Sequence, residues 1–301
     1  MESGLPSVRI QVVLFRQQLG DLWRLVPAAA AAARHAIGAR YAGAVTVAFG
    51  DCSPRPVVGD EDLRTMQAVA SEAGLGALTY EHFDENLGSS GGSNRLAEGS
   101  TDDFILVLNP DTYPAPNLLS RMLAPFHDAH VGAVDAHQLP LEHPKDFDPV
   151  TGDASWLSGS CMLVRGDVFR AVSGFDSEHF FLYCDDVDFS WRVRLLGFRT
   201  VHEPRAVVFH DKRIDTAGRI TATPLEGFYG SLGRLMLTHK FDRPDLLEET
   251  IAAIEAGGTA DQRAAVDEWR RRQAAGALPS VVAGAASVAQ FVGGEYARHR
   301  F

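Results

Sequence analysis

Five acidic or imidazole side chains in this sequence are suited to metal binding or acid–base chemistry. Asp111 follows the apolar run Phe104–Leu108 after an Asn-Pro pair, and His210 ends a later apolar run. Between them in sequence lies Asp185-Asp186-Val187-Asp188. Carboxylates at the mouth of a buried sheet suit Mg²⁺ or Mn²⁺, which take oxygen ligands and leave positions open for phosphate oxygens. A second carboxylate cluster can supply a general base.

Each of these residues also has a purely structural interpretation. An Asp after a strand commonly caps the next helix, here before Pro116. Acids at a helix start stabilise the positive end of the helix dipole, which would account for the run Asp185–Asp188. His210 alone fits a packed strand histidine. Only the combination of these residues favours a catalytic metal site.

A glycine-rich stretch, Glu85–Asn94, follows the third expected strand. Its glycines permit positive φ and a close backbone approach to a ligand, and Ser93 is placed to cap a helix over 94–98. Two interpretations stay open, a nucleotide-binding loop and a flexible connector. The stretch is not a dinucleotide fingerprint, because Ser90 stands where a glycine is required. Its Gly-x-Ser-x-Gly pattern lacks the directly preceding strand of an esterase nucleophile elbow.

Two further motifs are excluded. His202-Glu203 invites comparison with a zinc-protease helix, but Pro204 breaks the helix which that motif requires. The sequence also has no Gly-Lys-Ser/Thr and therefore no phosphate-binding P-loop.

Composition restricts the class of protein. The chain has 301 residues and a net charge of −11, which argues against a nucleic-acid binder because such a protein needs a basic face for phosphates. Its three cysteines are widely spaced without a Cys-x-x-Cys pair, so neither a disulfide framework nor a cysteine zinc site is expected. The N-terminus does not resemble a signal peptide, and the longest weakly charged run is too short and polar to span a membrane. These features predict a soluble cytoplasmic protein.

The elements that position these residues alternate between strand and helix. Strands are expected over 8–15, 45–49, 77–83, 104–108, 131–136, 156–165, 199–202 and 206–210, and helices over 19–37, 60–73, 117–129 and 185–196. This alternation predicts an α/β fold with a mixed, mostly parallel sheet flanked by helices and ligand-binding loops at the strand C-terminal ends. After about Thr216 only helical patterns follow, over 225–239, 244–256 and 260–275. We therefore predict a catalytic domain over 1–215 and a C-terminal helical extension over 216–301.

Five segments match one known family in the same order. They are Glu85-Asn86-x-Gly88 with Gly91-Gly92-x-Asn94, Leu108-Asn109-Pro110-Asp111-Thr112, Trp156-Leu157-Ser158-Gly159, Gly174-Phe175-Asp176, and Phe180–Arg192. In these segments the chain resembles family 2 glycosyltransferases with the GT-A fold, particularly their bacterial rhamnosyltransferase-like branch. The resemblance runs from about Val8 to His210.

The resemblance implies a role for each matching residue. Asp111 matches the last acid of the family's Asp-x-Asp metal motif, and His210 matches a late histidine that also meets the metal. Asp186 matches the acid proposed as general base. The residues that fall where donor sugar and acceptor meet are Trp156, Gly159 and Asp185. Those that fall where the nucleotide binds are Asp51, Asn86, Gly88, Gly91, Gly92, Asn94 and Asn109.

Two departures from the family pattern affect these assignments. Asn109 replaces the first acid of Asp-x-Asp, which removes a negative ligand and predicts weak metal binding before the donor's pyrophosphate arrives. The family's Asp-Asn-x-Ser after the second strand reads Gly50-Asp51-Cys52-Ser53 here. Asp51 is therefore shifted along the motif, which affects its expected contact with the base of the nucleotide.

The implied chemistry is an inverting, metal-dependent transfer of a sugar from a nucleotide-diphosphate donor to a hydroxyl of a glycan or lipid-linked acceptor, in cell-surface polysaccharide synthesis. Deoxythymidine diphosphate rhamnose leads as donor by resemblance, and uridine diphosphate sugars follow. Asp186 would take the acceptor proton, and Asp185 would raise the pKa of Asp186 if both are desolvated. Mg²⁺ or Mn²⁺ on Asp111 and His210 would neutralise the departing nucleoside diphosphate.

Two rival functions stay open. A non-catalytic relative that binds sugar nucleotides or glycans is favoured by Asn109 and opposed by the retention of Asp111, Asp186 and His210. A nucleotidyltransferase would need a glycine-rich basic loop after the first strand, which Gln17–Gly20 does not match.

Three surface features carry weaker predictions. The loop over 137–152 fits an acceptor lid or a solvated connector. The helix over 225–240 fits a peripheral contact with the inner face of the cell membrane, a contact with a second subunit, or packing on its own domain, and the last is favoured. Trp269–Arg272 fits a solvated helix face better than a phosphate patch.

Overall fold

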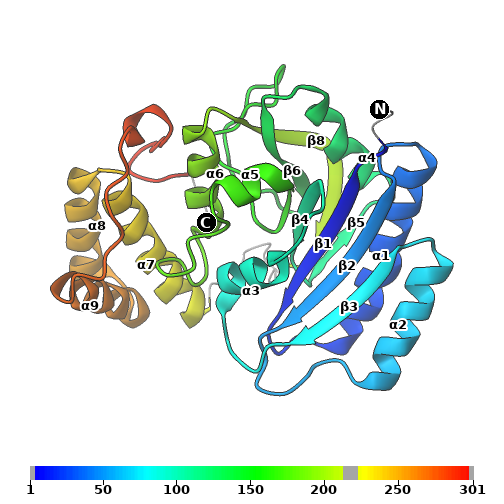
Figure 1. The fold of residues 1–301 in the computed structure, drawn as a ribbon. Helices are drawn as coiled ribbons and strands as arrows, with labels where there is room; N and C mark the ends of the chain where they lie inside the picture. The colour runs from blue at the N-terminus through cyan, green and yellow to red at the C-terminus, as the bar shows by residue number, and fades with distance from the viewer. Residues whose placement is uncertain (1–3, 213–222, 298–301) are drawn as a thin grey trace.

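The computed structural model describes residues 4–212 and 223–297, which form a twisted sheet with helices on both faces and a group of helices beside it (Figure 1). This arrangement confirms the predicted α/β class with flanking helices. The predicted domain edge at residues 215 and 216 lies outside the described residues, so the division of the chain at that point stays a prediction.

Within the described residues the sheet has eight strands, in the order β3-β2-β1-β4-β7-β6-β8-β5. Its first half is parallel, as the alternation of strands and helices predicts, and β6 and β8 are also parallel. β7 runs antiparallel to β4 and β6, and β5 runs antiparallel to β8. The strands are β1 (Ser7–Leu14), β2 (Ala44–Asp51), β3 (Ala77–His82), β4 (Phe104–Leu108), β5 (Thr112–Pro114), β6 (Val131–Leu139), β7 (Cys161–Arg165) and β8 (Arg199–His210).

Helices cover the two faces of this sheet because successive side chains of a strand point to opposite faces. In β4, Leu106 and Leu108 pack in the core under α1 and α4, whereas Ile105 and Val107 pack with α5 and α6. The helices of these layers are α1 (Leu19–Gly38), α2 (Asp60–Glu72), α3 (Gly88–Ala97), α4 (Leu118–Leu123), α5 (Gly166–Ala171) and α6 (Asp185–Leu195), with a 3₁₀ turn over Ala124–His127.

The C-terminal helices share a separate apolar core with the sheet domain. Leu235, Met236 and Trp269 are buried there against Trp191 of α6 and Phe180 of the loop before it. The helices are α7 (Pro224–Lys240), α8 (Pro244–Gly257) and α9 (Ala260–Ala274), followed by a 3₁₀ turn over Ala285–Ser287. The apolar side of α7 is therefore covered by its own chain.

The glycine-rich stretch forms a helix, so the expected loop and the expected cap at Ser93 are both wrong. Each glycine costs about 1 kcal/mol of helix propensity, which is why the sequence pattern indicates a loop. Tertiary packing overrides this preference, since α3 lies directly against β1 and β2. Gly88 begins the helix with φ +68°, and a Cβ there would lie 2.2 Å from the Phe181 carbonyl oxygen, so only glycine fits.

Two expected strands also differ. The strand expected over 156–165 begins only at Cys161, because the main-chain N–H groups of Ser158 and Gly159 donate to the carboxylates of Asp135 and Asp186 instead of a sheet ladder. The two strands expected over 199–210 are one continuous strand, β8. Pro204 is accommodated because the β6–β8 register shifts there, so that no ladder hydrogen bond is required of it.

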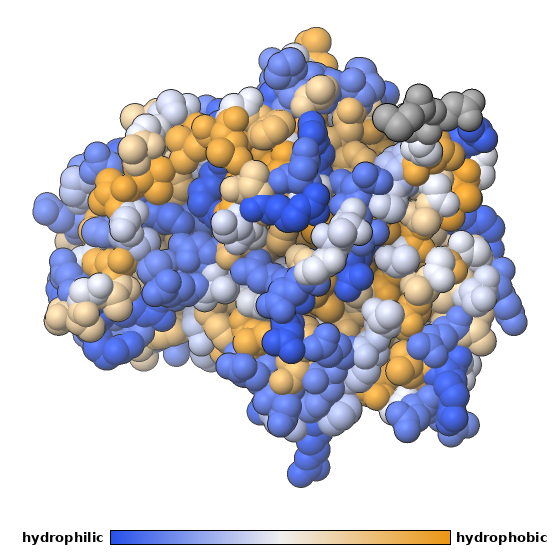
Figure 2. Space-filling model, in the orientation of Figure 1, coloured by the Kyte–Doolittle hydropathy of each residue, from blue (hydrophilic) through white to orange (hydrophobic). Residues whose placement is uncertain are grey.

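Figure 2 shows a mostly polar surface with apolar areas, one of them at the upper left over the chain that follows α9. Within residues 4–212 and 223–297 no helix combines the length and the apolar character needed to cross a membrane.

Candidate active site

A cavity of about 690 Å³ opens where β1, β4 and β8 end, between the sheet and the start of α7. Ligands of open α/β sheets commonly bind at the C-terminal ends of parallel strands, which is where β1 and β4 deliver the chain. The predicted site residues that line this cavity are Asn86, Gly88, Asn109, Asp111, Trp156, Gly159, Asp185, Asp186 and His210. The fold thus brings the two predicted carboxylate clusters to one cavity.

Asp111 and His210 are brought together by the pairing of β5 with β8. Thr112 pairs with His210 in that ladder, and Asp111 precedes Thr112 directly. The His210 Nε2 atom lies 3.5 Å from the Asp111 Oδ1 atom. The short strand β5, which the sequence pattern did not predict, brings these two side chains close together.

Gln138 of β6 orients the ring of His210. The His210 Nδ1 atom lies 2.8 Å from the Gln138 Oε1 atom, and the Gln138 amide nitrogen donates in turn to the Ser158 hydroxyl. Because the amide oxygen only accepts, the Nδ1 atom is the donor in this hydrogen bond, and the Nε2 atom faces Asp111. An imidazole nitrogen beside a carboxylate, with a second hydrogen bond that orients the ring, suits a divalent cation. The residues present therefore fit a metal at this position.

Asp186 lies at the N-terminus of α6 on the cavity wall. Its Oδ2 atom accepts a hydrogen bond of 2.9 Å from the Gly159 main-chain N–H, and its Oδ1 atom accepts one from Val187. A Cβ at residue 159 would lie 3.1 Å from the Asp186 Cβ, so glycine permits this close approach. Tyr183 and Cys184, which precede α6, have φ of 64° and 61°. Positive φ in non-glycine residues is a strained conformation that is typical of functional sites.

Asp185 lies partly buried beside Asp186. Its Oδ2 atom accepts hydrogen bonds of 2.9 Å from the Ser89 hydroxyl and 3.0 Å from the Ser90 hydroxyl. Burial and, second, the charge of Asp186 raise the pKa of Asp185 to about 6, although the two serines favour its charged form. The rise that was predicted for the pKa of Asp186 stays a prediction.

Asp188 has a different role from its two neighbours. It is fully buried away from the cavity, where it pairs with Arg192 at 2.7 Å and with Lys240 of α7 at 2.6 Å. Lys240 also contacts Asp176 at 2.7 Å. The run of acids therefore divides into two residues that face the cavity and one that ties α6 to α7.

Four predicted nucleotide-binding residues do not line the cavity. Asp51 is buried, and its carboxylate accepts hydrogen bonds from Ser53 N, Val57 N and the Tyr80 hydroxyl. Asn94 exchanges two hydrogen bonds of 2.8 Å with the main chain of Phe175. The remaining two, Gly91 and Gly92, lie within α3. Contact of these residues with a nucleotide stays a prediction.

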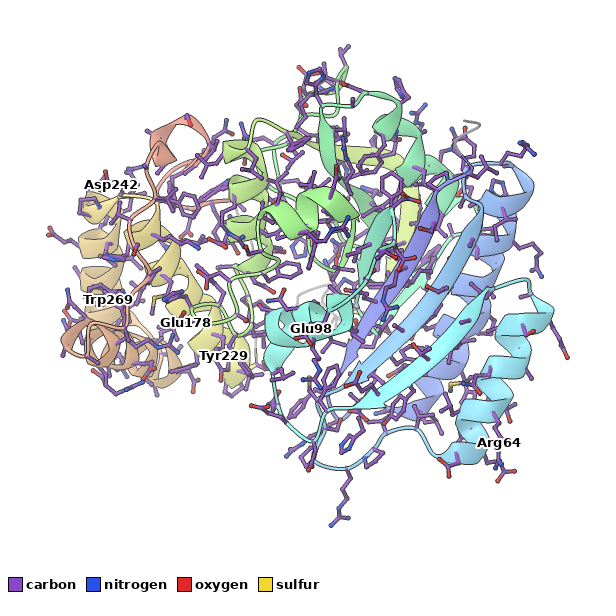
Figure 3. The ribbon with its side chains drawn as sticks, in the orientation of Figure 1. Arg64, Glu98, Glu178, Tyr229, Asp242 and Trp269 are labelled. Carbon is purple, nitrogen blue, oxygen red and sulfur yellow. The ribbon has the colours of Figure 1, made fainter. Side chains whose placement is uncertain are left out.

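Several residues that shape the cavity were not predicted from the sequence. Ser89 and Ser90 lay within the glycine-rich stretch but were not predicted as partners of Asp185, and Gln138 carried no signal of its own. Tyr229 of α7 and Tyr296 also line the cavity. Tyr229 stacks on Phe181 with ring centroids 5.1 Å apart, and Figure 3 shows it on the side of α7 nearest the sheet domain. The Tyr296 ring packs edge-on against Trp156 at 5.5 Å.

Residues 60–188, which include Asp111, Asp185 and Asp186, match the family model described as glycosyl transferase family 2. Over these residues the chain is similar to family 2 glycosyltransferases. A curated relative is the N-acetylglucosaminyl-diphospho-decaprenol L-rhamnosyltransferase of Mycobacterium tuberculosis, which is 35% identical over 189 residues. That match covers 51% of this chain and 59% of the relative, so the chain accounts for only part of the relative's length.

Solved structures confirm that this chain has the GT-A fold. The mannosyltransferase PcManGT from Pyrobaculum calidifontis, in complex with GDP-Man and Mn²⁺, aligns with a TM-score of 0.55 at 14% identity over 89% of this chain and 80% of that one. GalNAc-T7 with UDP, GalNAc and Mn²⁺ aligns with a TM-score of 0.58 at 12% identity over 93% of this chain and 56% of that one. At such low identity these structures establish the fold alone.

Proposed function

We propose that this chain is an inverting glycosyltransferase that moves a sugar from a nucleotide-diphosphate donor to a hydroxyl of a glycan or lipid-linked acceptor. The observation that carries the proposal is the shared cavity, with Asp186 on the wall formed by α6 and the Asp111–His210 pair at the end of β8. The names of the similar proteins, a rhamnosyltransferase and a mannosyltransferase, support this reaction class. A rhamnose donor activated by deoxythymidine diphosphate or a uridine diphosphate sugar is the proposed substrate, and cell-surface polysaccharide synthesis is the proposed context.

Asp186 is the proposed general base. As the acceptor oxygen attacks the anomeric carbon, its proton passes to the Asp186 carboxylate, and the bond from the anomeric carbon to the phosphate oxygen breaks. One displacement inverts the configuration at that carbon. The Gly159 N–H holds the carboxylate in place, and the neighbouring Asp185 strengthens it as a base once Asp185 is ionised.

Asp111 and His210 are the proposed metal ligands. Mg²⁺ or Mn²⁺ bound there would supply Lewis-acid neutralisation of the charge on the departing nucleoside diphosphate. Two of the similar structures contain Mn²⁺, which favours a divalent cation in this class of fold. Asn109 contributes an amide in place of a negative ligand, so we expect metal affinity to rise when donor pyrophosphate is present.

The experiment is a transfer assay of the Asp186→Asn variant with a panel of nucleotide sugars and Mn²⁺ or Mg²⁺. We expect turnover to fall about 10²- to 10⁴-fold, because general-base catalysis contributes about that much. The metal-dependent rise in melting temperature caused by the donor should persist, since Asp186 is not a proposed donor ligand.

Asp267→Asn is a matched control on the exposed side of α9 and should leave both properties unchanged. Donor binding by the wild type without transfer to any acceptor would instead support the rival function, a catalytically degenerate binding protein. Normal turnover of Asp186→Asn would refute the assignment of the base. The expected cytoplasmic location and a peripheral membrane contact stay predictions.

A further inference from the structure

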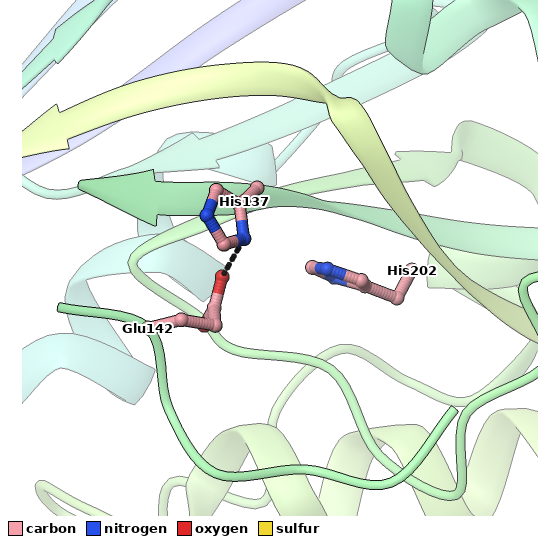
Figure 4. A group of neighbouring side chains, drawn as sticks. All are labelled: His137, Glu142 and His202. Atoms are coloured by element: carbon pink, nitrogen blue, oxygen red, sulfur yellow. Dashed lines mark ion pairs between the residues drawn. The ribbon is translucent and has the colours of Figure 1, made fainter. Parts of the chain in front are cut away.

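A second group of metal-ligating side chains lies beside the active-site cavity. His137 of β6, Glu142 of the following loop and His202 of β8 each offer one ligand atom, and these atoms all lie within 4.8 Å of one another. Figure 4 shows the His202 ring directed toward the space that His137 and Glu142 border. None of these residues belongs to the Asp111–His210 pair.

The spacing in this cluster is close to that of a coordinated cation. The His137 Nδ1 atom lies 3.2 Å from the Glu142 Oε2 atom. Two ligands of a tetrahedral zinc, each about 2.0–2.1 Å from the metal, are separated by about 3.3 Å. Because the ligand atoms lie at most 4.8 Å apart, the distance from the His202 nitrogen to either of the other two must shorten by about 1.5 Å at most to reach this separation.

His202 is already oriented as a metal ligand. Its Nδ1 atom lies 2.8 Å from the Asp135 Oδ1 atom, which leaves Nε2 as the nitrogen that can bind a cation. Asp135 is fully buried and is also paired with Lys145. A carboxylate behind an imidazole fixes the ring and raises the basicity of the ligating nitrogen.

The chemistry of the donors indicates which cation binds. Two imidazoles and one carboxylate suit zinc, whereas Mg²⁺ and Mn²⁺ prefer oxygen ligands. Phe147 packs over the His202 ring with centroids 4.7 Å apart, and His202 is buried. The His137 side chain is 34% exposed, which provides a path for entry of the cation.

We propose that His137, Glu142 and His202 form a zinc site that is separate from the proposed donor-metal site. The site would join the loop over 140–145 to β6 and β8. Glu142 and His143 of that loop line the catalytic cavity, so zinc would fix one wall of the cavity. This proposal does not depend on sugar transfer, because its evidence lies outside the reacting groups.

The test measures zinc binding to the full chain after removal of metals with a chelator. We expect about one zinc per chain by elemental analysis and calorimetric titration, and a tetrahedral absorption spectrum when Co²⁺ replaces zinc. At a zinc concentration about 100 times the dissociation constant, the melting temperature should rise by about 5 °C.

His137→Asn and Glu142→Gln should each weaken zinc binding by at least about 10-fold and remove the Co²⁺ spectrum. Both residues are partly exposed, and circular dichroism of each variant establishes that it is folded. His130→Asn, at a histidine whose side chain is 80% exposed, is the matched control and should bind zinc normally. Asp111→Asn should also bind zinc normally, because it alters only the donor-metal site.

Three results would overturn the proposal. They are the absence of zinc binding by the metal-free wild type, unchanged affinity in both His137→Asn and Glu142→Gln, and loss of the zinc in Asp111→Asn. The last result would assign the cation to the donor-metal site.

Discussion

At the residue scale, the neighbouring carboxylates Asp185 and Asp186 differ in their hydrogen-bond partners. Asp186 accepts a hydrogen bond from a main-chain N–H, while Asp185 is partly buried, accepts hydrogen bonds from two serine hydroxyls and has its pKa raised to about 6. Because the two carboxyl groups are close, they titrate as a coupled pair, and the first and second protons are lost with different apparent pKa values. The structure thus predicts how the stability of the fold depends on pH, which the sequence alone does not.

Asp185→Asn should change how stability depends on pH. In the wild type the folded chain keeps the Asp185 proton up to about pH 6, whereas the same carboxyl in the unfolded chain has its ordinary pKa of 3.8. Between these values unfolding releases a proton, so the wild-type free energy of unfolding falls as pH rises, by at most about 3 kcal/mol. Urea unfolding from pH 4 to 7 should show this fall in the wild type and its loss in Asp185→Asn.

The serine partners supply a control for this pH effect. Replacing Ser89 and Ser90 by alanine removes two hydrogen bonds to the charged form of Asp185, so the pKa of Asp185 should rise. The fall in the free energy of unfolding with pH should then extend above pH 6. Identical pH profiles for the wild type and Asp185→Asn would show that Asp185 does not titrate in this range.

At the scale of elements, the position of α6 depends on charges from α7. Lys240 has a side chain that is only 8% exposed, and it pairs with Asp176 and with the fully buried Asp188. A buried pair is weak evidence for net stabilisation, but removing one partner leaves uncompensated charge. Lys240 is therefore a residue that positions the helix which carries Asp185 and Asp186.

Lys240→Met keeps most of the side-chain volume and removes the charge. We expect it to lower the free energy of unfolding by about 3–5 kcal/mol, because two carboxylates lose their buried cation. Chemical denaturation measures this change. Arg270→Met, which breaks an exposed ion pair with Glu255, should cost less than about 1 kcal/mol. Equal effects for the two variants would contradict a buried role for Lys240.

The same elements show what could be predicted from sequence. Strand and helix alternation predicted the parallel half of the sheet, and residue type predicted the two carboxylate clusters at one cavity. Long-range partners could not be predicted, since Ser90 and Asp185, or Gln138 and His210, lie far apart in sequence and meet only through the fold. The helix at Gly88–Ala97 was missed because packing against β1 and β2 outweighs the low helix propensity of its glycines.

At the scale of the whole molecule, the sheet domain and the C-terminal helices depend on each other for burial. Trp191 and Phe180 are almost fully buried in the core that α7, α8 and α9 complete. Exposing a large apolar side chain costs about 1.5–3 kcal/mol, and several are exposed at once if these helices are removed. The Lys240 contacts with Asp176 and Asp188 are lost as well.

A chain ended at residue 215 should therefore fail to fold cooperatively, even though it contains the whole predicted catalytic domain. The full chain should unfold in one transition, because two regions that share a core lose their packing together. Tryptophan fluorescence and far-ultraviolet circular dichroism should then give the same urea midpoint for the full chain, since Trp191 and Trp269 lie in the shared core. A 1–215 fragment with a sharp unfolding transition and native-like donor binding would show instead that the helices are an independent extension. The cavity residues Tyr229 and Tyr296 would be absent from that fragment, so retained binding would also exclude them from the donor site.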